Sequence, residues 1–113
     1  MTFDPNQSLP QEEVTERVDE AIEENDVVLF MKGTPVMPQC GYSERALGLL
    51  GKHREDVATV DALESLEEFR TALERHSGRE TIPQTFVDGE FVGGSDILAQ
   101  LEERGELGEK LAV

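Results

Sequence analysis

The sequence predicts an α/β domain, a mixed four-stranded sheet with helices on both faces and an extra N-terminal helix. Helix-like and strand-like segments alternate along the 113 residues, a length that suits one domain, which we place at residues 11–113 after a flexible segment, residues 1–10. A helix joins the first two strand-like segments, so we expect parallel strands with a right-handed crossover. The last two strand-like segments flank Asp88-Gly89, which favours an antiparallel two-residue hairpin.

The first helix should begin with Ser8 as its cap and Pro10 in its first turn, and apolar residues at helical spacing continue it to about residue 24. Residues 27–31 then form a continuous apolar run of strand length. Such a run is typical of a strand that is buried on both faces of a sheet. We therefore expect this strand to lie inside the sheet.

The remaining elements follow from the same periodicities and from turn residues. Two glycines weaken the second helix, a glycine ends the third, and Gly93-Gly94 turns the chain into the last helix. We predict a helix over residues 40–53, unless its glycines end it early near Gly51, and a strand over 57–61. A helix over 63–76, a hairpin over 84–92 and a helix from 95 to about 105 follow.

The composition is strongly acidic, with 25 Asp and Glu against 10 Lys and Arg and a net charge of −15. A phosphate backbone would be repelled, so we exclude nucleic acid as a partner. No apolar run approaches the roughly 18–20 residues of a membrane span, and the N-terminus lacks an export signal, so we expect no membrane association and a cytoplasmic location. The acid is spread along the whole chain, which favours a halophilic protein over an ordinary solvated acidic surface.

Cys40 is the only cysteine, so the chain cannot form an internal disulfide. A loop containing Gly33, Pro35 and Pro38 leads to it, and a helix begins at or just after it, where the helix N-terminus lowers the pKa of a thiol. We therefore predict a reactive thiolate and not an inert buried cysteine. Ser43 stands where a second cysteine would complete a Cys-x-x-Cys pair. Cys40 can thus form only a mixed disulfide with an outside thiol, or donate one ligand to a metal centre.

Two other segments are candidates for ligand binding. Ile82-Pro83 precedes the third strand and favours extended geometry, although the sequence leaves open whether this bond is cis. Gly93-Gly94-Ser95-Asp96 is a glycine-rich turn into the last helix, where free N–H groups can bind a carboxylate. A plain helix cap is the alternative for this turn, and the cysteine loop favours the binding role.

Together these motifs resemble those of the monothiol glutaredoxins, which have the thioredoxin fold. Residues Phe30–Ser43 are similar to the family signature Lys-Gly-Thr-Pro-x-x-Pro-x-Cys-Gly-Phe-Ser. Thr81–Gln84 resembles the cis-proline segment of the family, and Asp88–Ile97 resembles its hairpin and glycine turn. The resemblance covers roughly residues 14–107 in consistent order.

The resemblance implies a glutathione site. Carried over by position, Lys32 would hold the glycyl carboxylate, with Arg70 assisting from the third helix. Ile82 would pair its backbone with the cysteinyl part of the ligand. Ser95 and Asp96 would bind the γ-glutamyl end.

The resemblance also implies a cluster carrier, in which a [2Fe-2S] cluster lies between two subunits of a homodimer and is ligated by Cys40 and a small thiol from each side. Apo iron–sulfur proteins would receive the cluster, and a BolA-type protein is a possible further partner. The alternative is an enzyme, a thiol–disulfide oxidoreductase that acts through a monothiol Cys40 mixed disulfide. Ser43 and the loop before Cys40 favour the carrier.

The sequence departs from the family pattern at several positions. Tyr42 replaces the usual phenylalanine, and Arg79-Glu80 stand where many members have Trp-Pro, which removes an aromatic wall of the site. The acidic composition adds an alternative for the ligand, because a salt-adapted host can use another small thiol such as γ-glutamylcysteine, which lacks the glycine. Lys32 and Arg70 would then meet a different carboxylate.

Overall fold

The computed structural model describes residues 8–113, so most of the segment that we predict to be flexible, residues 1–7, lies outside the described part. Within residues 8–113 no helix is long and apolar enough to cross a membrane.

The strands form one mixed sheet in the order β2-β1-β3-β4. β1 (Val27–Met31) is parallel to β2 (Ala58–Asp61) and antiparallel to β3 (Gln84–Val87). β3 pairs with β4 (Glu90–Gly93) across a tight turn in which Asp88 and Gly89 both have positive φ, 50° and 80°. The predicted mixed sheet, parallel crossover and Asp-Gly hairpin are therefore confirmed.

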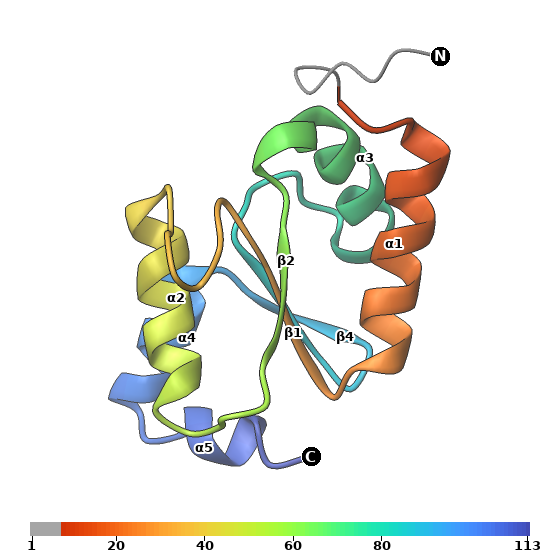
Figure 1. Cartoon of the computed structure of the whole chain (residues 1–113). Coiled ribbons are helices and arrows are strands. Elements are labelled where there is room, and N and C mark those ends of the chain that lie inside the picture. Colours follow the sequence, from red (N-terminus) through yellow and green to blue (C-terminus); the bar gives the residue numbers. More distant parts are fainter. Residues whose placement is uncertain (1–7) are drawn as a thin grey trace.

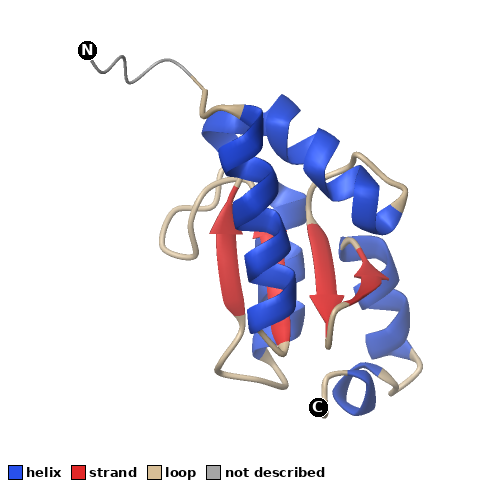
Figure 2. Ribbon diagram, turned by 90° about the vertical axis from the view of Figure 1, so that its right-hand side faces the viewer, coloured by secondary structure: helices blue, strands red, loops and turns tan. Residues whose placement is uncertain are grey.

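Helices cover both faces of this sheet (Figures 1 and 2). α1 (Gln11–Glu24) and α3 (Leu66–Ser77) pack side by side on one face, and α3 follows a short 3-10 turn, Leu63–Ser65. α2 (Gly41–Gly51) and α4 (Ser95–Glu103) pack together on the other face, where α5 (Leu107–Lys110) extends the layer.

β1 lies at the centre because alternate side chains enter two separate cores. Val28 and Phe30 pack with the apolar faces of α1 and α3, whereas Val27, Leu29 and Met31 pack with those of α2, α4 and α5. Every residue of β1 is fully buried, which confirms the two-sided burial that its continuous apolar run predicts.

One local prediction was wrong, one alternative was decided, and one helix was not predicted. α1 begins at Gln11 with Pro10 in the cap position and no side-chain cap, so Ser8 does not cap it. The N–H of Leu9 donates instead to the Ser65 hydroxyl, 3.0 Å away, which anchors this end of the described chain to the start of α3. The second helix ends at Gly51, the earlier of the two ends that the sequence left open. The sequence reading also missed α5, whose Leu107 and the following Leu111 are buried in the second core.

Candidate functional site

Cys40 occupies the cap position of α2, with extended backbone (φ −152°, ψ 129°) and a partly exposed side chain. The loop before it is a tight, hydrogen-bonded turn: Gly33 bridges to Pro38, and the N–H of Gln39 donates to the Lys32 carbonyl over 3.0 Å. Gly33 has φ +93°, and an added Cβ would lie 2.6 Å from the Met37 carbonyl oxygen. Only glycine fits there, so the position of the thiol depends on this residue.

The loop is also fastened to the neighbouring strand. The Asp61 carboxylate oxygen, at the end of β2, accepts hydrogen bonds from the N–H groups of Gly33 and Leu63, each over 2.9 Å. The N–H of Ala62 donates to the Met31 carbonyl over 2.8 Å. These contacts connect the thiol loop, the ends of β1 and β2, and the turn that leads into α3.

The surroundings of Cys40 favour its thiolate. Burial raises the pKa of the thiol, but the N–H groups of Ser43 and Tyr42, the Ser43 hydroxyl and the charge of Lys32 together lower it further, so the pKa lies below its ordinary value. Ser43 is fully buried, and its oxygen accepts the N–H of Lys32 over 3.0 Å. That bond orients the hydroxyl, which is then free to donate to the sulfur.

The Ile82-Pro83 segment and the glycine turn lie against each other. The Ile82–Pro83 peptide is cis, which answers the question that the sequence left open. An added Cβ on Gly94 would lie 3.1 Å from the Pro83 carbonyl oxygen, so the absence of a side chain allows the two segments to meet. Gln84, fully buried, donates its amide to the carbonyls of Arg79 and Thr81 over 2.8 and 2.9 Å and so shapes the chain before the cis bond.

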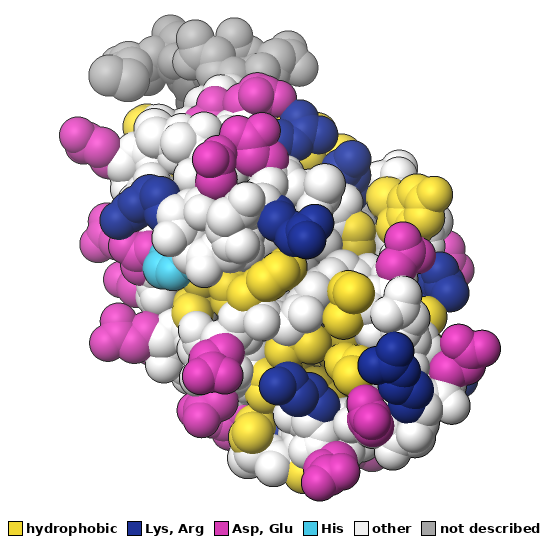
Figure 3. Space-filling view, turned by 180° about the vertical axis from the view of Figure 1, so that it is seen from behind, with side chains coloured by type: hydrophobic (Ala, Val, Ile, Leu, Met, Phe, Trp, Pro, Cys, Tyr) yellow, Lys and Arg dark blue, Asp and Glu magenta, His cyan; other side chains and the backbone are white. Residues whose placement is uncertain are grey.

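A groove with a volume of about 560 Å³ follows this junction. Seen from behind, hydrophobic side chains cross the face between the two helical layers, with Lys and Arg side chains at their border (Figure 3). The groove is lined by Tyr42, Arg79, Thr81, Ile82, Pro83, Phe91, Val92, Gly93, Gly94, Ser95, Asp96 and Ile97.

The structure brings part of the predicted site together. Ile82, Ser95 and Asp96 line the groove, and Tyr42 connects it to the first turn of α2, next to Cys40. Asp96 contacts the Arg45 guanidinium at 3.3 Å. Cys40, Lys32 and Arg70 are not among the lining residues.

The two predicted cations have different surroundings. Lys32 is half-buried at the end of β1, close enough to Cys40 for its charge to lower the pKa of the thiol. Arg70 is bound to Glu67 of the same helix, with Nη1 and Oε1 2.7 Å apart. The sequence did not indicate the roles of Gln84 or of the Arg70–Glu67 pair. A polar residue that opens the third strand was the available signal for Gln84.

Comparisons with known proteins agree with this geometry. The family model described as Glutaredoxin matches residues 27–92. An uncharacterized monothiol glutaredoxin of Synechocystis is 44% identical over 89% of this chain and 94% of its own length. The mitochondrial monothiol glutaredoxin-5 of Saccharomyces cerevisiae is 43% identical over 88% of this chain and 67% of its own.

The chain belongs to the glutaredoxin family, as a monothiol member. The solution structure of reduced poplar apo GrxS14 superposes with a TM-score of 0.73 and 38% identity, covering 87% of this chain and 89% of that one. The predicted resemblance and the thioredoxin fold are therefore confirmed.

For this glutaredoxin we expect the alkylation rate of Cys40 to rise with pH, with the midpoint of the rise at a pH below the ordinary pKa of cysteine. The reason is that the thiolate is the reacting form and its pKa is lowered. Ser43→Ala removes a donor to the sulfur, so its profile should shift to higher pH. Iodoacetamide kinetics measure both profiles, with the exposed Thr71→Ala on α3 as control. Coincident profiles for wild type and Ser43→Ala would contradict this role of Ser43.

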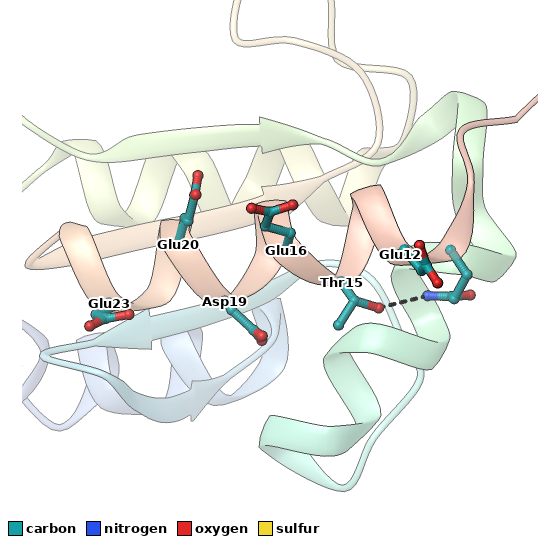
Figure 4. Close-up of a pocket in the computed structure, with 7 residues that line it drawn as sticks. Glu12, Thr15, Glu16, Asp19, Glu20 and Glu23 are labelled. Carbon is teal, nitrogen blue, oxygen red and sulfur yellow. Dashed lines mark hydrogen bonds between the residues drawn. The ribbon is translucent and has the colours of Figure 1, made fainter.

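A second hollow lies far from the thiol, along α1 of the glutaredoxin (Figure 4). Carboxylates project from successive turns of the helix, and Glu12, Glu16 and Glu20 follow one another at the i,i+4 spacing that brings like charges close. Within residues 8–113 these three make no ion pair. The hollow therefore marks a repulsive surface and not the site of the chemistry.

This repulsion predicts salt-dependent stability. The melting temperature should rise by about 5 °C or more between low and molar KCl, because salt screens exposed like charges. Glu16→Gln should stabilise the protein in low salt by a few tenths of a kcal/mol. The control is Glu13→Gln, which instead loses an ion pair with Arg17 at 2.8 Å. Melting curves at both salt concentrations measure these changes, and a melting temperature that does not change with salt would rule out salt adaptation.

Metal-ligating side chains are not grouped elsewhere in the described chain. Residues 8–113 contain no cluster of three or more His, Cys, Asp or Glu that could hold a metal ion. The two histidines contact carboxylates, His53 after α2 with Glu102 of α4 at 2.9 Å and His76 of α3 with Asp19 of α1 at 2.7 Å. Cys40 is therefore the one thiolate ligand that this part of the chain presents.

Proposed function

We propose that this monothiol glutaredoxin binds a [2Fe-2S] cluster between two copies of itself and transfers it to apo iron–sulfur proteins. The observation that carries the proposal is the Cys40 site. An accessible thiol with a lowered pKa begins α2, and a buried serine occupies the position of a resolving cysteine. Such a site supplies one strong ligand and cannot close a disulfide within the chain.

The ligand count supports sharing of the cluster. A [2Fe-2S] cluster takes about four thiolate-type ligands, and each chain offers one. Two chains supply two ligands, and two small thiols supply the rest. The cluster is then cargo that leaves when another protein offers its own cysteines.

The groove supports a small thiol of the γ-glutamyl class, either glutathione or γ-glutamylcysteine. Ser95 and Asp96 begin α4, where backbone N–H groups favour a carboxylate and Asp96 can accept an ammonium. The extended backbone of Ile82 would pair with the cysteinyl part. Lys32 would hold the remaining carboxylate, and Arg70, which contacts Glu67, is the assisting residue that the resemblance implies.

A second function uses the same thiolate. Cys40 would attack the small-thiol sulfur of a mixed disulfide and release the substrate as a thiolate. A second small thiol would then attack the Cys40 adduct, which frees Cys40 and forms the small-molecule disulfide. The lowered pKa of Cys40 favours this reaction, so the oxidoreductase remains the alternative.

Anaerobic purification of the full chain tests the proposal. We expect a brown dimer that releases iron, sulfide and a small thiol on acidification, and that passes its cluster to an apo-ferredoxin. Mass spectrometry of the released thiol distinguishes glutathione from γ-glutamylcysteine. A colourless monomer with strong disulfide reductase activity would instead support the oxidoreductase.

The remaining partners and the location are part of the same proposal. A BolA-type protein could replace one of the two copies around the cluster. A cytoplasmic location stays a prediction, and the Saccharomyces relative is named as mitochondrial. Cell fractionation with an antibody against the chain would test it.

A further inference from the structure

We propose that Arg79 binds a carboxylate of the small thiol and so determines which thiols this glutaredoxin accepts. This inference rests on the proposed function, because it concerns the ligand of the same groove. It assigns to Arg79 the assisting role that the resemblance gives to Arg70. The ligand class is a small thiol with an ammonium group at one end and a free carboxylate at the other.

Arg70 is poorly placed to receive another anion. Its guanidinium lies 2.7 Å from Glu67, and further carboxylates are near. A hydrogen bond with Glu74 raises the pKa of Glu80, the charges of Glu74 and Glu67 add to this, and the charge of Arg70 opposes it. Arg70 thus stands among carboxylates, and a ligand carboxylate would compete with Glu67 for its guanidinium.

The surroundings of Arg79 differ from those of Arg70, because no carboxylate is bound to its guanidinium within residues 8–113. It lines the groove, its residue is exposed, and its guanidinium forms no hydrogen bond or ion pair with another part of residues 8–113. Its backbone is held firmly, since its carbonyl accepts from buried Gln84 at 2.8 Å and its N–H donates to the Ser77 hydroxyl at 3.0 Å. A free cation on a fixed stretch of backbone suits the capture of a carboxylate.

Arg79 lies on the side of the groove where we expect the carboxylate end of the bound thiol. Arg79 follows the end of α3 and so approaches the groove from the layer of α1 and α3. Asp96 begins α4 and approaches it from the layer of α2 and α4. Ile82 and Pro83 line the same groove. A ligand with its ammonium at Asp96 and its thiol near Cys40 would therefore turn its other end toward Arg79.

Chemical-shift titration of the ¹⁵N-labelled full chain tests this, with reduced glutathione and its glycine ethyl ester as probes. Wild type should bind glutathione more tightly than the ester. Arg79→Ala should weaken glutathione binding by about three- to fivefold and leave ester binding unchanged, since an exposed ion pair contributes about that much. Arg79→Lys should keep part of the preference. Arg75→Ala, an exposed arginine on α3 outside the groove, is the matched control and should behave as wild type.

The outcomes separate this inference from the proposed function. If wild type binds glutathione but Arg79→Ala binds both probes as wild type does, Arg79 has no such role and the proposed function stands. If Arg79→Ala weakens both probes equally, the residue shapes the groove and does not recognise the carboxylate. γ-Glutamylcysteine is titrated into wild type as well. If wild type binds neither glutathione nor γ-glutamylcysteine, the small-thiol function and this inference both fail.

Discussion

Cys40→Ser should abolish cluster binding and leave the purified protein a colourless monomer. A serine hydroxyl is not a thiolate, and residues 8–113 offer no other group of side chains that could hold iron. The dimer should be lost together with the cluster, completely and not by degrees. Without the shared cluster, two chains of net charge −15 repel each other. Visible absorption, iron analysis and light scattering on anaerobic preparations measure the effect.

The control for Cys40→Ser is Met37→Ala, which removes an exposed sulfur-bearing side chain from the same loop. We expect this variant to remain brown and dimeric. A Cys40→Ser protein that keeps its colour would mean that the ligands lie elsewhere. A colourless variant that is still a dimer would mean that the contact between chains does not depend on the cluster.

Gly33→Ala should destabilise the fold by about 2–4 kcal/mol and disturb the thiol site as well. The residue has φ +93°, and the new Cβ would lie 2.6 Å from the Met37 oxygen and 2.7 Å from the Gln39 nitrogen. Both neighbours are backbone atoms of the loop that leads to Cys40, so relief of the clash requires the loop to move. Urea unfolding measures the stability, and iodoacetamide kinetics report whether Cys40 keeps its reactivity.

Gly48→Ala is the matched control for Gly33→Ala. It lies inside α2 with nothing within 4 Å of an added Cβ, and alanine favours a helix over glycine by about 1 kcal/mol. We expect this variant to be as stable as wild type or more stable, with unchanged thiol kinetics. If Gly33→Ala behaved in the same way, the loop would not depend on the geometry of this residue.

The fold was predictable where one local pattern allows one structure. The apolar run of β1 fits only a strand between two layers, and Asp88-Gly89 fits only a tight hairpin turn. Prediction failed where tertiary contacts decide the outcome. α5 has few residues and a glycine at its second position, and it forms because the second core buries Leu107 and Leu111. Ser8 resembles a helix cap, but Pro10 takes that position in the structure.

The chemistry of the site was predictable only in part. The position of Cys40 at a helix start follows from the sequence, because a Gly/Pro loop leads into a helical period. Pairings between side chains on exposed surfaces do not follow in this way, since acidic residues are plentiful and many partners are possible. The Arg70–Glu67 and Arg45–Asp96 contacts are of this kind, and they emerge only from the packed structure.

Asp61 affects the conformational entropy that the thiol loop loses when a ligand binds. Its carboxylate joins the thiol loop to the turn before α3, so that loop takes its shape as the sheet forms. Flexible loops lose conformational freedom when they close on a ligand, and this loss weakens binding. A loop that is ordered beforehand avoids the loss, so capture of a small thiol restricts the motion of the ligand and hardly that of the protein.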